Sequence, residues 1–147
     1  MRLQRKNKKW ITYSLFDHVE PIYKRDINGN LVTEVIDGDQ VPIEVGEQDI
    51  YTAPERMLVS FSTGGKSAIK DEYGIDESDW NAMIMVELGK LDLDTTSLVW
   101  RNNSVTYRGD GTVDPNSAEY KVVRVLPSNT VIRYLLQKVV DGNENDN

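Results

Sequence analysis

The stretch EYKVVRVLPSNTVIRYLLQKVV, residues 119–140, is the most regular part of the chain and decides its fold class. Its first half alternates apolar and polar side chains with a period of two residues, which is typical of a β-strand. Pro127-Ser128-Asn129 is a turn signal, and a second strand follows it with Ile132, Tyr134 and Leu136 on one face. The stretch therefore predicts two strands joined by a turn, with one apolar face.

Segments of the same type recur at short spacing through the rest of the sequence. Strands are predicted at Lys9–Phe16, Val19–Arg25, Leu31–Ile36, Val41–Val45, Arg56–Thr63, Asn81–Leu88, Leu98–Arg101 and Val105–Tyr107. For Asn81–Leu88, a dense apolar run, a short helix is the alternative. With Gly, Asn and Pro between them, these segments indicate a mainly β protein, a small antiparallel β-barrel or sandwich.

The clearest local turn lies at Asn28-Gly29, a pair that readily adopts the positive φ angles of a tight hairpin. We therefore expect Val19–Arg25 to pair with Leu31–Ile36. Asp37-Gly38-Asp39 predicts a second turn, whereas Gly46–Pro54 is polar and is predicted to be irregular.

At 147 residues the chain is long enough for one domain with a real core. We divide it into a basic N-terminal arm (residues 1–9), a single β domain (residues 10–140) and a disordered acidic tail (residues 141–147). No apolar run approaches the ~18 residues that a membrane span needs, and no secretion signal is visible. The sequence therefore favours a protein of the cytoplasm with no membrane partner.

The chain has no cysteine and one histidine, which restricts its chemistry. Disulfides, thiolate metal sites and cysteine nucleophiles are excluded, and His18 alone cannot build a site that needs two imidazoles. The acidic residues do not follow the spacing of a calcium loop. We expect no metal, no cofactor and no catalysis, with a paired-carboxylate hydrolase as the alternative, since carboxylate separation depends on the fold.

The net charge of −7 is unevenly spread. The basic arm holds five positive charges, from Arg2, Arg5, Lys6, Lys8 and Lys9, so the remainder carries −12. An acidic protein repels nucleic acid as a whole. The arm is therefore expected to contact phosphate or an acidic neighbour locally, or else to be a disordered, solubilising terminus.

Two short motifs are better explained as loops. Gly65-Lys66-Ser67 resembles the end of a phosphate-binding loop, but the glycine required five residues earlier is replaced by Ser60. Arg108-Gly109-Asp110, a tripeptide that adhesion receptors recognise, is more simply a charged loop. Among the tryptophans, Trp100 lies in an apolar strand and is predicted to be core, whereas Trp80 is the candidate interface anchor.

Two long polar insertions interrupt the strands, at residues 63–80 and at residues 109–117. After the first of them the chain runs through Leu98-Val99-Trp100 and then a more specific late pattern. That pattern comprises Tyr120, Val122, Val125, Ser128, Asn129, Ile132 and Tyr134. Taken together, the C-terminal half resembles the head-closure (stopper, or neck) proteins of long-tailed phages of Gram-positive bacteria. The likeness covers the last 60 residues well and the first 85 loosely.

This resemblance implies a protein of the virion neck, assembled in the host cytoplasm, that forms a homo-oligomeric ring. Its partners would be portal and adaptor ring proteins on one side and tail-terminator or tail-tube proteins on the other. The ring would close the channel after DNA packaging, with steric contact to packaged DNA, and offer a platform for the tail. A loop from each subunit would converge on the axis and move aside on ejection.

The insertions supply the candidate channel loops. The first set of candidates is Gly64, Gly65, Lys66, Ser67, Lys70, Tyr73 and Gly74, and the second set is Arg108, Gly109, Asp110 and Gly111. The five basic arm residues and Trp80 are the candidate contacts to neighbouring subunits. Two alternatives stay open: another virion part such as a tail terminator or minor capsid protein, and an unrelated enzyme or ligand-binding domain. The last needs a concave site gathering His18 with acids such as Asp76 and Asp79.

Overall fold

The computed structural model describes residues 8–63, 74–75 and 79–139. Within these ranges lie ten strands and a short 3-10 helix at Pro115–Ser117. The strands are β1 (Lys8–Ser14), β2 (Phe16–Tyr23), β3 (Thr33–Ile36), β4 (Asp39–Pro42), β5 (Glu44–Tyr51), β6 (Glu55–Ser62), β7 (Ala82–Glu87), β8 (Leu98–Trp100), β9 (Tyr120–Pro127) and β10 (Val131–Lys138). The prediction of a mainly β protein is confirmed.

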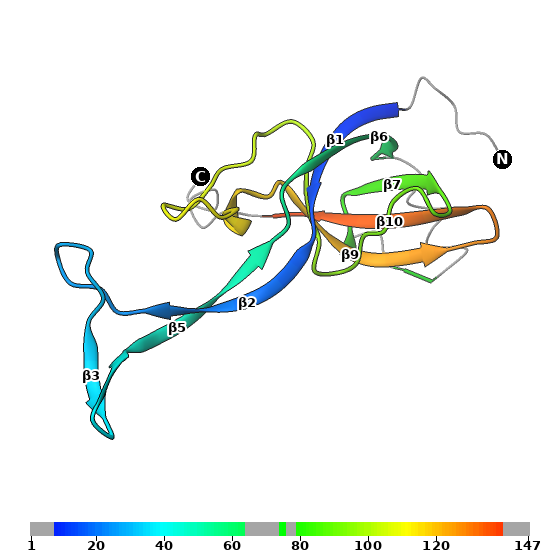
Figure 1. The fold of residues 1–147 in the computed structure, drawn as a ribbon. Helices are drawn as coiled ribbons and strands as arrows, with labels where there is room; N and C mark the ends of the chain where they lie inside the picture. The colour runs from blue at the N-terminus through cyan, green and yellow to red at the C-terminus, as the bar shows by residue number, and fades with distance from the viewer. Residues whose placement is uncertain (1–7, 64–73, 76–78, 140–147) are drawn as a thin grey trace. The chain divides into compact units, whose positions relative to one another are not determined.

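Six of these strands form a closed antiparallel barrel in the order β1-β6-β7-β10-β9-β8. β1 closes the ring, because it pairs with β6 along Lys8–Tyr13 and with β8 along Thr12–Ser14. β9 and β10 form the hairpin predicted from the late sequence stretch, and β7 pairs with the other edge of β10 (Figure 1). The barrel alternative of the predicted fold class is therefore the correct one.

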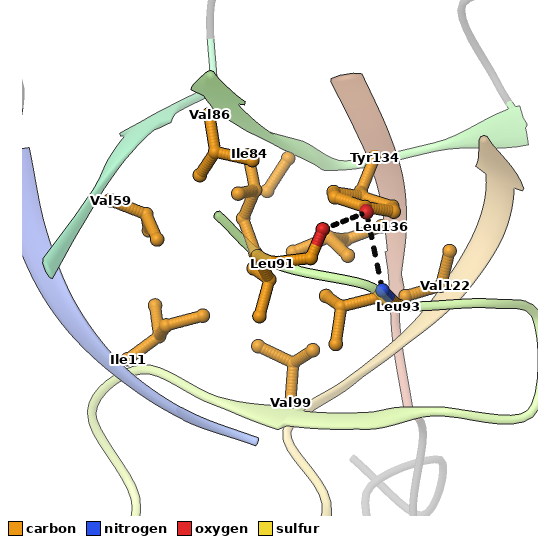
Figure 2. Close-up of a cluster of buried hydrophobic side chains, with 11 residues drawn as sticks. Ile11, Val59, Ile84, Val86, Leu91, Leu93, Val99, Val122, Tyr134 and Leu136 are labelled. Carbon is orange, nitrogen blue, oxygen red and sulfur yellow. Dashed lines mark hydrogen bonds between the residues drawn. The ribbon is translucent and has the colours of Figure 1, made fainter. Parts of the chain in front are cut away.

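Alternation along the strands fills the barrel interior. Its core contains Ile11, Val59, Ile84, Val86, Val99, Val122, Tyr134 and Leu136, with Ile132 packed against it, so the predicted apolar face of the last strand is confirmed. The chain between β7 and β8 adds Leu91 and Leu93 to this core (Figure 2). The Tyr134 hydroxyl holds that segment, since it donates to the Leu91 carbonyl (2.8 Å) and accepts from the Leu93 amide (3.2 Å).

Trp80 belongs to a second, smaller core on the other face of the same hairpin. Its side chain is fully buried with Leu135, Leu126 and Ile75. Leu135 lies between two interior residues of β10 and so points to the opposite side. The prediction that Trp80 is an interface anchor is therefore wrong, because the Trp80 indole packs onto the outer face of the β9–β10 hairpin. Trp100 is core, as predicted.

The chain divides into two compact units. Phe16–Tyr51 forms one unit, here called the insert because it separates β1 from β6 in the sequence, and the rest forms the barrel unit. The span predicted as a single domain, residues 10–140, holds both. Within the insert, β2 pairs with β5 and β3 pairs with β4 as separate two-stranded sheets.

Strand pairing in the insert differs from the prediction. The turn at Asn28-Gly29 is present, with Gly29 at φ 87°, but beyond it only the bridge Arg25–Leu31 forms between the two predicted partners. β2 instead pairs with β5, which occupies most of a segment predicted to be irregular. The turn preceding β4 is confirmed, with Asp37 at φ 52° and Gly38 at φ 89°. Local turn chemistry located both bends correctly. The second bend joins β3 to β4, which overlap the predicted strands Leu31–Ile36 and Val41–Val45, whereas the partner of β2 was predicted wrongly.

Candidate assembly interface

The two units differ in the strand edges that they leave open. Each barrel strand has a neighbour on both sides, so the barrel has no open edge. The structure describes every residue of the insert, and its four strands form two separate two-stranded sheets. A strand with one neighbour keeps a row of outward-pointing backbone groups that a further strand can pair with. The insert is therefore the part of the chain suited to pairing with another protein.

The insert also lacks a hydrophobic core. Ile50 is its one buried residue, and β2 is exposed along its whole length. Nine of the thirteen exposed large hydrophobic residues in the described chain lie here: Phe16, Val19, Ile22, Tyr23, Ile27, Leu31, Val35, Ile36 and Val45. Isolated apolar residues on a surface are ordinary, but their concentration in one segment marks an interaction surface.

The negative charge of the chain is concentrated in the same segment. The insert contains nine acidic residues and two basic ones, Lys24 and Arg25, for a net charge of −7. This equals the net charge of the whole chain, so the remaining residues balance to zero. Apolar side chains with acidic side chains between them favour a partner that is both apolar and basic.

Backbone and side-chain hydrogen bonds hold the insert together in place of a core. Lys24, Val32 and Ile43 form a junction between the two sheets, in which the amide of Lys24 donates to Ile43, that of Ile43 to Val32, and that of Val32 to Lys24. At the Asn28-Gly29 turn, one carboxylate oxygen of Asp26 accepts from the amides of Asn28 and Asn30. These bonds specify the strand path without burying apolar surface.

His18, the single histidine, lies on β2 in an exposed position. Its two ring nitrogens are each 3.0 Å from a carboxylate, Nδ1 from Asp17 and Nε2 from Glu20. The bond to Glu20, followed by the bond to Asp17, raises the pKa of His18 above its ordinary value. Both partners are its neighbours on the same exposed strand, so this group is a local charge cluster, and it lacks the enclosed surroundings of a catalytic base.

The barrel unit carries a polar hollow. Asn103, Thr106, Asp114, Glu119 and Lys138 contribute to its lining. One Glu119 oxygen accepts from the amides of Arg101, Asn102 and Asn103 at 2.7–3.0 Å.

The Glu119 carboxylate has a structural role in this hollow. Burial acts to raise its pKa, but the three amides together with Lys138 outweigh burial and lower it. The carboxylate fixes the chain after β8. Among the described residues no cluster of three or more His, Cys, Asp or Glu could hold a metal ion.

The second predicted channel loop is an ordered hairpin. Tyr107 and Val113 form a bridge where Val105–Tyr107 was predicted as a strand. The Arg108 amide donates to Thr112, and the Gly111 amide donates back to Arg108. Arg108, Gly109, Asp110 and Gly111 form its tip, where Gly111 adopts φ 89°. The channel role of these four residues stays a prediction.

Most other predicted site residues fall outside the described ranges. These are Gly64, Gly65, Lys66, Ser67, Lys70 and Tyr73 of the first channel loop, Arg2, Arg5 and Lys6 of the basic arm, and the acidic tail at residues 141–147. Of the remaining candidates, Gly74 has φ 71°, while Lys8 and Lys9 begin β1. Lys9 is exposed and Lys8 is half-buried.

Comparison of the chain with protein-family models, with curated proteins and with solved structures finds no match. In the described part of the chain, no helix is long and apolar enough to cross a membrane.

Sequence reasoning did not single out the insert as a functional surface. The signal was present, because a run of 36 residues with nine acids, two basic residues and many β-branched or aromatic side chains is unusual. Without knowing which side chains are buried, however, the apolar positions of the insert resemble those of any core strand.

Proposed function

We propose that this chain is a head-closure subunit in the neck of a long-tailed phage, a structural virion protein without catalytic activity. In this role it forms a ring with portal and adaptor proteins, closes the channel after DNA packaging and carries the platform for the tail. The late sequence pattern supports the choice of family. The observation that carries the proposal is the insert, which exposes nine large hydrophobic side chains and buries one residue.

The physical argument starts from what two-stranded sheets can do alone. Such a sheet is at best marginally stable in water, because neither of its faces is covered. The β2–β5 pair is long, and its apolar residues Val19, Ile22 and Tyr23 are each at least 40% exposed. Covering them with another protein removes this apolar surface from water. A chain that combines such a surface with a closed barrel is suited to assembly.

The charge distribution favours a protein as the partner of the insert over DNA. A surface of net charge −7 repels the phosphate backbone. In the proposed neck, closure of the channel is therefore steric, and the insert lies against protein neighbours. Outside the insert the charges sum to zero, because the basic arm balances the acidic residues that remain, so only the basic arm attracts DNA.

The proposal is tested by mixing the purified chain with portal–adaptor assemblies and with tail-terminator and tail-tube proteins. Size-exclusion chromatography with multi-angle scattering should show a monomer alone and ring-sized complexes with the adaptor. Failure to associate with any neck or tail component refutes the proposal. A virion map that places the chain at the tail side of the neck would assign it instead as a tail terminator.

A pair of matched variants tests whether the insert mediates that association. V35T/I36T removes two exposed apolar side chains from β3 of the insert, and L88T/Y107T removes two from the barrel unit. Threonine keeps strand propensity, so folding should be unaffected in both cases. V35T/I36T should weaken adaptor binding by about tenfold or more, while L88T/Y107T should bind like the wild type. Equal effects of the two variants would contradict the role of the insert.

A further inference from the structure

Two segments of the chain carry strong charge of opposite sign. The insert has a net charge of −7. Residues 1–9 contain five basic residues and no acidic one. Residues 10–15 are uncharged, and residues 52–147 hold ten basic against fifteen acidic residues, so positive charge in excess occurs only in the basic arm. The basic arm is therefore the part of this chain that complements the insert.

The two segments also complement each other in apolar character. Glu34, Glu44 and Glu47 are exposed on β3 and β5, and the exposed apolar residues Val35 and Val45 are their neighbours in sequence. In the basic arm, Leu3 lies between Arg2 and Arg5. β5 has β2 as its one strand neighbour and contains no proline, so no residue along its other edge lacks a backbone N–H group. An extended basic peptide can thus find both charge and strand pairing along β5.

We infer that the insert of one subunit binds the basic arm of a neighbouring copy of this chain, so that subunits join head to tail. The contact is heterologous, because it joins two different surfaces, and repetition of such a contact generates a ring when the rotation closes. The inference rests on the proposed function for its ring context, and it names one partner of the insert in that ring.

The contact is assigned between copies because a basic arm that binds the insert of its own chain joins no second subunit, whereas an exchange between subunits links them into a ring. The cross-linking experiment described below distinguishes these two arrangements.

The strength expected of this contact fits a subunit that assembles on a template. Exposed ion pairs are individually weak and are screened by salt. A single contact of this type leaves the chain monomeric in dilute solution. When an adaptor ring holds many copies side by side, the effective concentration rises steeply and the same contact closes the ring. We therefore expect rings to form on the adaptor and the free chain to stay monomeric in dilute solution.

The test uses sedimentation velocity on the full chain at up to millimolar concentration. Association should appear at about 50 mM NaCl and weaken about tenfold or more at about 500 mM. Two variants each remove three charges from one surface: R2Q/R5Q/K6Q from the basic arm and E34Q/E44Q/E47Q from the insert. Each should weaken association by about tenfold. The control E55Q/E87Q/D92N removes the same number of exposed acidic charges from the barrel unit and should behave like the wild type.

Mixing the two neutralised variants tests the head-to-tail geometry. Each variant retains one intact surface, so an equimolar mixture should form heterodimers at wild-type strength and nothing larger. Because the chain has no cysteine, K6C and E47C on separate chains should also form a disulfide-linked heterodimer. The inference is overturned by a wild type that stays monomeric at millimolar concentration in low salt. It is overturned equally by a mixture without heterodimers, or by a K6C/E47C double variant that cross-links only within one chain.

This experiment and the adaptor-binding experiment fail independently. The first uses the purified chain alone, so a negative result leaves adaptor binding untouched. Conversely, a chain that associates head to tail but binds no neck or tail component would refute the neck assignment and retain the contact between copies.

Discussion

Replacing Tyr134 by phenylalanine tests how the barrel interior is closed. The Tyr134 ring is fully buried, and its hydroxyl is the shared partner of the Leu91 carbonyl and the Leu93 amide, both on buried residues. Phenylalanine keeps the ring and removes the hydroxyl. The two backbone groups then lose a buried hydrogen bond each, and a buried polar group without a partner costs about 1–3 kcal/mol. We expect Y134F to lower the free energy of unfolding by about 2–3 kcal/mol.

Urea and thermal unfolding followed by tryptophan fluorescence measure this effect. All three tryptophans belong to the barrel unit, so the signal reports on the barrel. For a unit of this size, the expected loss corresponds to a melting temperature lower by about 8–12 °C. Y107F serves as the control, because Tyr107 is 56% exposed and its substitution should change stability by less than about 0.5 kcal/mol. A Y134F variant as stable as Y107F would refute the idea that this hydroxyl anchors the segment between β7 and β8.

Three further predictions concern single groups. E119A should lower the free energy of unfolding in urea by about 3 kcal/mol at neutral pH, since three amides lose a charged acceptor. Because the folded pKa of Glu119 is lowered, this stabilisation is complete above its ordinary pKa of 4.5 and disappears as the pH falls through the folded pKa. Wild type and E119A should therefore have the same stability in acid, and a difference that does not depend on pH would contradict the role of the charge. NMR titration of His18 should give a pKa above 6.5, and the variant D17N/E20Q should return this pKa to about 6.5. The stabilisation from the two carboxylates is complete below pH 6.5 and is lost as the pH rises through the folded pKa. An unchanged pKa in D17N/E20Q would show that the carboxylates are not the cause. G38A should destabilise the β3–β4 turn by about 1 kcal/mol, measured by hydrogen exchange, because Gly38 has φ 89°. The control G46A should not destabilise the insert, because Gly46 has an ordinary φ and its added methyl group would meet only Ile22. Equal protection from exchange in both variants would argue against backbone strain at Gly38.

The strands of the barrel were largely predictable. β6, β7, β9 and β10 all fall within one or two residues of the predicted limits, because each is rich in apolar and β-branched side chains and is bounded by turn or loop residues. Trp100 was identified as core for the same reason, since it lies in a short apolar strand. Where a strand has one face in a core, its local pattern carries the information needed to recognise it.

The insert and Trp80 were not predictable in the same way. The Asn28-Gly29 turn was located correctly, yet the partner of β2 is a strand that follows two further strands in the sequence. Trp80 was taken for a contact residue because polar residues precede it, whereas it packs on Leu135 of the last strand. Both errors concern contacts between residues far apart in the chain, about which a local pattern is silent.

The sequence by itself determined that this is a β protein, because side-chain alternation with period two is a local property that each strand carries in its own residues. It also determined where the charges lie along the chain, including the basic arm. Only the tertiary structure decided that six strands close into a barrel while Phe16–Tyr51 remains a pair of two-stranded sheets with exposed apolar residues. Strand partners and burial depend on which distant segments meet, and that is set by the folded chain as a whole.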